Sequence, residues 1–187
     1  WYRSRGLGDV YKRQILNYNE PKSIGYIAPF YGNFGILVRA YAYILSLGSN
    51  GLLGTSNRAV LNANYLQEKM RPLFGAPYRG RCMHEFVFSG EFLKEYGVNV
   101  LDLAKGLIDY GFHPPTIYFP LNVPEAIMIE PTETEDRDML DNFVEKVSLL
   151  IEQARKNADV LHNAPKTTPV SRLDEKKAAK DMRLNYS

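Results

Sequence analysis

The stretch "VLDLAKGLIDYGFHPPTIYFP", Val100–Pro120, contains a helix, a stop and a strand in direct succession. Gly111 can take a positive φ and close the helix at its C-terminal end. Pro114 and Pro115 each fix their own φ and push the preceding residue out of the α region. His113 is therefore expected on a stiff connection between a helix and a strand. The helical spacing of four apolar residues predicts the inward face: Leu101, Ala104, Leu107 and Ile108.

Strand patterns lie on both sides of this helix. "HEFVFS", residues 84–89, predicts one strand, and "TIYFPL" and "AIMIEP", residues 116–121 and 126–131, predict two more around the turn-forming "NVPE". A helix follows them. From Arg81 to Asn157 the order is therefore strand, helix, strand, strand, helix. This order predicts an α+β fold with helices on one face of a mostly antiparallel sheet.

The last helix has the clearest periodicity. Thr132 and Glu135 stand at the spacing of a capping box, which predicts the helix start. One apolar stripe then continues through five turns and is expected to face the core. Its members are Leu140, Phe143, Val144, Val147, Leu150, Ile151 and Ala154.

Two further helices are predicted upstream. The apolar run Ile36–Leu47 has 12 residues and includes Arg39, so it is too short to span a bilayer and favours a buried helix. "GSNG" ends it, and a second helix is expected over Leu52–Met70. Its predicted inward residues are Leu53, Val60, Leu61, Asn64, Tyr65 and Leu66.

Composition excludes several classes of protein. The chain has 187 residues, 45% hydrophobic and 24% charged, which is ordinary for a soluble globular protein. A net charge of +2 gives no electrostatic case for nucleic acid or an anionic membrane as partner. The single cysteine, Cys82, excludes an internal disulfide and favours a cytoplasmic location.

Local motifs do not identify an activity by themselves. "HEFVF" lacks the second histidine of a zinc helix, and no metal site is predicted. The acids of "EPTETED" are typical of a helix N-terminus. His84 and His113 remain as candidates, for packing or for chemistry. On its residues alone the chain is a soluble α+β domain without an assignable activity.

Several longer strings carry a resemblance. "YGNFGILVRAYAYILSLGSNGL", "AVLNANYL", "CMHEFVFSG", "LDLAKGLIDYGFHPPTIYFPL" and "EAIMIEPTETEDRDMLDNF" resemble the C-terminal part of the glycine cleavage system P protein. More narrowly, they are similar to subunit 2 of the two-subunit glycine dehydrogenase (decarboxylating). The resemblance covers about residues 23–180, in order and without obvious gaps.

The resemblance implies the small C-terminal domain of a fold-type I enzyme that uses pyridoxal phosphate. Such an enzyme decarboxylates glycine and passes the aminomethyl group to the lipoyl group of the H protein. Glycine dehydrogenase subunit 1 and the H protein are the implied partners, in a hetero-oligomer. The family's Schiff-base lysine lies in an Asn-x-His-Lys-Thr string, which this chain lacks. No catalytic lysine is therefore assigned, and we expect the chain to be inactive alone.

The chain is expected to divide into four parts. "DVYKRQ" is similar to a translated sequencing adapter, so residues 1–14 are interpreted as a disordered artefact. Residues 15–80 would be a loop and helical segment linking to a missing cofactor domain. Residues 81–163 would form the α+β C-terminal domain, and residues 164–187 an extended tail.

Candidate site residues follow from the resemblance and from their positions in loops. Tyr31, Gly32 and Asn33 would approach the cofactor. His84, His113 and Thr116 would face the substrate cleft. Two other interpretations stay open: a stand-alone α+β binding or regulatory module, and another fold-type I enzyme such as an aminotransferase. An aminotransferase usually binds a substrate carboxylate through an arginine in this domain. Arg172 is the only arginine after Arg155 with a loop context, and it neither supports nor excludes that interpretation.

Overall fold

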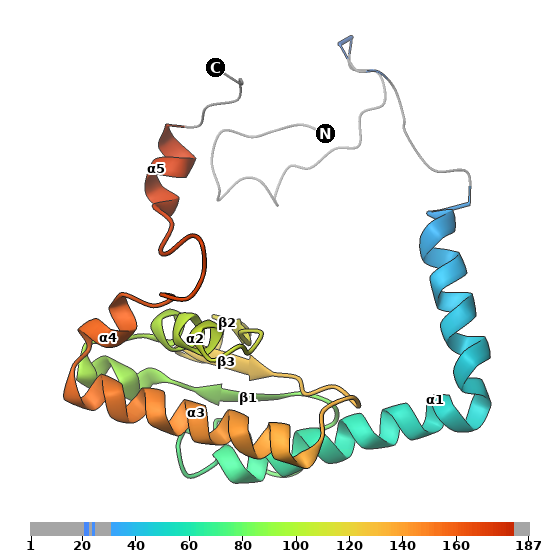
Figure 1. Cartoon of the computed structure of the whole chain (residues 1–187), viewed down its shortest axis with the longest axis horizontal. Helices are drawn as coiled ribbons and strands as arrows, with labels where there is room; N and C mark the ends of the chain where they lie inside the picture. Colours follow the sequence, from blue (N-terminus) through green and yellow to red (C-terminus); the bar gives the residue numbers. More distant parts are fainter. Residues whose placement is uncertain (1–20, 23, 25–30, 182–187) are drawn as a thin grey trace. The chain divides into compact units, whose positions relative to one another are not determined.

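A computed structural model describes residues 21, 22, 24 and 31–181 of the chain. The chain divides into two units, residues 1–49 and residues 50–187. Residues 1–14, interpreted above as an artefact, lie outside the described residues, as does the end of the tail from residue 182. The fold class, α+β with an antiparallel sheet, is confirmed in the second unit (Figure 1).

The first helix is long and broken. Helix α1 covers Phe34–Met70, and Gly48 interrupts it with φ of 61° and ψ of −174°. The two predicted helices are therefore two pieces of α1 that meet at this glycine, whose lack of a Cβ permits the positive φ. By length and composition α1 could cross a membrane, since an 18-residue window of it has a mean hydropathy of 1.3. One such helix is weak evidence for a membrane segment. Ile36, Tyr41 and Leu45 are 60–65% exposed, so the predicted burial of the helix over Ile36–Leu47 was wrong.

The inward face of the second piece of α1 differs from the prediction. Ala63, Leu66, Gln67 and Met70 are buried, and these come from its last two turns. Leu53 and Leu61 are 63% and 67% exposed, so their predicted burial was wrong. The apolar pattern indicated a helix, but the sequence alone could not show that only its last two turns pack against the domain.

The sheet has three antiparallel strands in the order β1-β3-β2: β1 is Phe86–Ser89, β2 is Thr116–Ile117 and β3 is Ala126–Ile129. Phe86 pairs with Ile129 and Phe88 with Ile127, and all four are buried on one face. These four residues share a hydrophobic cluster with residues of α1, of α2 (Val100–Asp109) and of α3 (Arg137–Lys156). The helices therefore pack on this face, as predicted.

Strand β2 is shorter than the predicted "TIYFPL". Tyr118 takes a φ of 60°, which leaves the β region and ends the strand after Ile117. A 3₁₀ helix, η1, covers Glu91–Tyr96 between β1 and α2. No sequence pattern predicted this 3₁₀ helix.

Helix α2 ends as predicted. Gly111 has a φ of 81°. Its N–H donates to the carbonyl of Ile108, and the N–H of Phe112 donates to that of Leu107. This is the bond pattern of a Schellman motif. Of the four predicted inward residues, Ala104 and Leu107 are buried, whereas Leu101 and Ile108 are half-buried.

Helix α3 buries six of the seven residues in the predicted stripe, and Val144 is half-buried. The predicted capping box was wrong. Asp136 caps the helix instead, with its carboxylate accepting from the N–H of Met139 at 2.8 Å. Thr132 and Glu135 lie before the helix, where their backbone makes a turn.

The tail is more ordered than an extended segment. It follows the short helix α4 (Asp159–His162) and contains α5 (Glu175–Lys180). Asp109 accepts hydrogen bonds from the backbone of Lys166 and Thr167 and from the Thr167 hydroxyl, at 2.6–2.8 Å. These bonds hold the first part of the tail against the end of α2.

Candidate functional site

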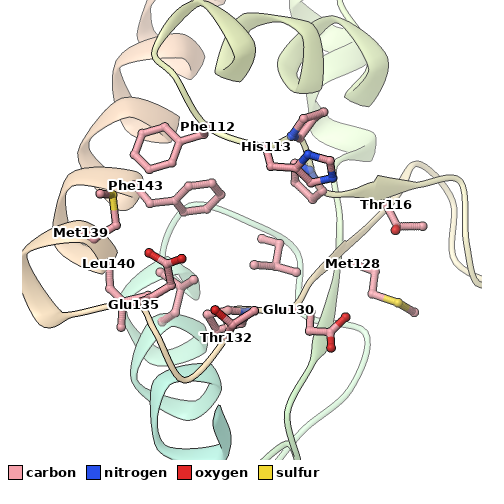
Figure 2. A pocket seen from close by; sticks show the side chains of 15 residues that line it. Phe112, His113, Thr116, Met128, Glu130, Thr132, Glu135, Met139, Leu140 and Phe143 are labelled. Atoms are coloured by element: carbon pink, nitrogen blue, oxygen red, sulfur yellow. The ribbon is translucent and has the colours of Figure 1, made fainter. Parts of the chain in front are cut away.

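A cavity of about 470 Å³ opens beside the elbow between α2 and β2 (Figure 2). All of its lining residues belong to the second unit, between Leu66 of α1 and Phe143 of α3. The apolar lining comes from helices α1 and α3, strand β3 and the loops beside them: Leu66, Phe112, Pro114, Pro115, Met128, Ile129, Pro131, Met139, Leu140 and Phe143. The polar lining consists of His113, Thr116, Glu130, Thr132 and Glu135.

The Schellman motif and the two prolines place His113 on the cavity wall. The ring of Phe112 packs edge-on against that of Phe143, with centroids 5.2 Å apart, which fixes the residue before His113. His113 itself is exposed and makes no hydrogen bond or ion pair with the residues that the structure describes. The imidazole nitrogens are therefore not engaged by the described residues and are accessible to a ligand.

Two carboxylates lie across the cavity from His113. In Figure 2 the Glu135 side chain points into the space, while Glu130 extends outward at its edge. Glu135 is half-buried and Glu130 is exposed. Because carboxylates attract positive charge, this side of the cavity favours an ammonium group over an anion. The acidic string "EPTETED" was interpreted as a helix start, so its contribution to a cavity was missed.

The other candidates of the substrate cleft lie close by. Thr116 lines the cavity as the first residue of β2. His84 does not line it, but its Nε2 lies 3.9 Å from Oε1 of Glu130, which does. The structure thus brings His113 and Thr116 together and places His84 behind the acidic edge.

The three candidates for the cofactor lie in the first unit. Tyr31 is 84% exposed, and Gly32 has a φ of 101° with nothing within 4 Å of a Cβ added there. The side chain of Asn33 accepts from the N–H of Ile36 at 3.3 Å, so it caps the start of α1. These residues form no closed cradle around a phosphate.

The cavity does not fit pyridoxal phosphate as a complete site. Its lining contains no lysine to form a Schiff base and no arginine or lysine to neutralise a phosphate. Burial raises the pKa of the Cys82 thiol, so this cysteine is not an activated nucleophile. Among the described residues no cluster of three His, Cys, Asp or Glu could hold a metal ion.

Arg172 is not available to bind a substrate. Its Nη2 donates to the buried carboxylate of Asp102 at 2.7 Å and to the carbonyl of Leu161 at 2.9 Å. Its Nε donates to the carbonyl of Ala164 at 2.6 Å. These bonds tie the tail to α2, and they leave the Arg172 guanidinium engaged with protein groups rather than open to a substrate carboxylate.

Comparisons with known proteins identify the family of the chain. Residues 55–169 match the sequence profile of the family described as "Glycine dehydrogenase, C-terminal domain". The chain is 52% identical over 171 residues to the probable glycine dehydrogenase (decarboxylating) subunit 2 of Bacillus cytotoxicus, covering 91% of this chain and 35% of the relative. The proteins of the same name from Bacillus cereus strain G9842 and Bacillus anthracis strain CDC 684 are also 52% identical, over 172 residues and 92% of this chain.

The chain thus spans about a third of the length of these relatives. All the residues that line the cavity fall inside the matched segment. The identity extends over nearly the whole chain and agrees with the profile match. The chain belongs to the family of the glycine dehydrogenase C-terminal domain.

Proposed function

We propose that this chain acts as the C-terminal domain of a glycine dehydrogenase (decarboxylating), and that its cavity forms one wall of the enzyme's substrate cleft. The observation that carries the proposal is the match over residues 55–169, which includes every residue lining the cavity. The named relatives are subunit 2 of this enzyme. The whole enzyme would decarboxylate glycine and transfer the aminomethyl group to the lipoyl group of the H protein.

Within that enzyme, the residues of this chain would bind and orient the substrate. Pyridoxal phosphate, when bound, would accept the electrons released on decarboxylation. The imidazole of His113 can donate or accept one hydrogen bond at a ring nitrogen held by the elbow. The apolar side chains of Phe112, Phe143 and Leu140, which line the cavity, would help to exclude water from it. Glu135 supplies negative charge near an ammonium group. Thr116 and His84 complete the proposed cleft residues.

The remaining assignments follow from the family. Pyridoxal phosphate would be held mainly by segments outside this chain, with Tyr31, Gly32 and Asn33 as the contribution from here. The small domain of a fold-type I enzyme is the proposed larger context. Glycine dehydrogenase subunit 1 and the H protein are the proposed partners, in a hetero-oligomer. A cytoplasmic location is supported by the single cysteine.

A hybrid protein tests the function. The matching C-terminal segment of the Bacillus cereus relative is exchanged for this chain, and the hybrid is purified together with its subunit 1. We expect exchange of label between bicarbonate and the carboxyl group of glycine within about tenfold of the parent, since shape and contacts are shared. The relative truncated before the segment is the control. A folded hybrid that binds pyridoxal phosphate but shows no exchange would refute the proposal.

A further inference from the structure

We propose that Asn62 is a positioning residue, whose side-chain amide fixes the acidic wall of the cavity, residues 132–135, against helix α1. The placement of this wall depends on contacts in the structure alone. Only the consequence for turnover rests on the proposed function.

A single nitrogen of the Asn62 side chain makes both hydrogen bonds to the turn. Nδ2 of Asn62 donates to the carbonyl oxygens of Thr132 and Glu135, each at 2.9 Å. An amide NH₂ group has two hydrogens, so each carbonyl receives one. The N–H of Glu135 also donates to the carbonyl of Thr132 at 3.3 Å. A single side chain therefore holds both ends of the turn that carries Thr132 and Glu135.

Both ends of that turn line the cavity. Thr132 and Glu135 contribute to its polar lining, and Glu135 points into it (Figure 2). The turn lies between the end of β3 at Ile129 and the cap of α3 at Asp136. Loss of the amide would leave two carbonyl oxygens without this donor. The turn would then move toward water, and Glu135 would move with it.

The start of α3 is held to α1 in a separate way. The hydroxyl of Tyr65 donates to Asp141 at 2.7 Å, and Lys69 lies 3.3 Å from the same carboxylate. Arg137 donates to the Tyr65 hydroxyl at 3.3 Å. A change at Asn62 should therefore release the turn without releasing the helix. This separation makes the effect local.

Asn64 provides a matched control on the same helix. Its Nδ2 donates to the carbonyl of Cys82 at 2.7 Å, and its Oδ1 accepts from the N–H of Cys82 at 3.1 Å. It thus ties α1 to another loop with two hydrogen bonds. Cys82 does not line the cavity. Asn62→Ala removes two hydrogen bonds and Asn64→Ala three, one of them to the carbonyl of Val60 within α1, but only Asn62 bonds to residues that line the cavity.

Methionine methyl NMR of the full chain separates the two roles. Met128 and Met139 line the cavity, Met83 follows Cys82, and Met70 is buried in the core. We expect Asn62→Ala to shift or broaden the methyl signals of Met139 and Met128 and to leave Met70 unchanged. Asn64→Ala should affect Met83 instead. Asn62→Asp keeps the shape of the side chain, places a carboxylate against the two carbonyls, and serves if the alanine variant unfolds.

The inference is overturned if folded Asn62 variants leave the Met128 and Met139 signals as in the parent chain. In the hybrid enzyme, Asn62→Ala should lower kcat/KM about tenfold with an unchanged unfolding temperature, because a displaced wall misplaces the ligand. Asn64→Ala should lower it less than Asn62→Ala does, because the loop that Asn64 holds does not line the cavity and approaches it only through His84. An inactive unmodified hybrid would refute the proposed function, while the NMR result would still decide the role of Asn62.

Discussion

The N-terminal piece of α1 and the α+β unit both contain large apolar side chains. These side chains are exposed in the first region and mostly buried in the second. Phe34, Ile36, Tyr41 and Leu45 are 60–79% exposed, whereas Phe88 of β1, Leu107 of α2 and Leu150 of α3 are buried. A surface helix normally turns its apolar stripe inward. The first region is thus a helix whose apolar side chains are not covered by the described residues, and the second is a domain that provides its own core.

The largest expected difference concerns one phenylalanine in each region. Phe88 is fully buried, and Phe34 is 79% exposed. Phe88→Ala should lower the free energy of unfolding by about 3–5 kcal/mol through lost burial and a cavity. Phe34→Ala should change it by less than about 0.5 kcal/mol. Urea denaturation followed by circular dichroism measures both, and equal losses would break the comparison.

The tail tests whether the α+β unit extends beyond its sheet and helices. Arg172→Leu leaves the buried carboxylate of Asp102 without its cation and should cost about 1–3 kcal/mol. It should also expose the tail to proteases near residue 170. Arg79, which is exposed, provides the control Arg79→Leu with no expected effect. Unchanged stability and protease resistance in the Arg172 variant would contradict the account.

The contact between α1 and α3 predicts a pH effect. The hydrogen bond from the Tyr65 hydroxyl, with Lys69 and Arg137 nearby, lowers the pKa of Asp141. A carboxyl group with a lowered pKa in the folded state adds stability above its unfolded pKa, near 4, and loses it as the pH falls through the folded value. Asp141→Asn should therefore flatten the acid side of the stability profile. Parallel profiles for variant and parent would exclude this contribution.

The smallest expected effect on stability is at the exposed helix. Ile36→Lys combined with Leu45→Lys should leave the unfolding transition of the α+β unit unchanged, since neither residue is buried there. The pair should reduce self-association of the isolated chain, because exposed apolar patches drive it. Sedimentation velocity at several concentrations measures this. A shifted unfolding midpoint would show that the two regions are less independent than described.

The sequence predicted the parts of the fold that depend on local periodicity. The stripe of α3 and the Gly111 stop need only the spacing of apolar residues and the freedom of glycine. The predicted burial of Leu53 and Leu61 was wrong because the apolar pattern does not show which turns of a helix contact the domain. The cap at Asp136 was missed because Thr132 and Glu135 have capping-box spacing but use their carbonyls in a turn.

The candidate site was predictable only in part. The prolines around His113 indicated a stiff elbow, and the structure places that histidine on a cavity wall. Asn62 had no distinctive pattern, and the pattern around Glu135 indicated a helix start rather than a cavity, since their contact joins residues 73 positions apart. Long-range contacts of this kind have no local signal in a single sequence.

The most direct measurement of the central claim is His113→Ala in the hybrid enzyme. Because His113 is exposed and without a described partner, its loss should leave the unfolding temperature within about 1 °C of the parent. If the imidazole takes part in proton transfer or hydrogen bonding in the cleft, label exchange between bicarbonate and glycine should fall about 100-fold. Normal exchange together with a lowered unfolding temperature would make His113 a packing residue and contradict the account.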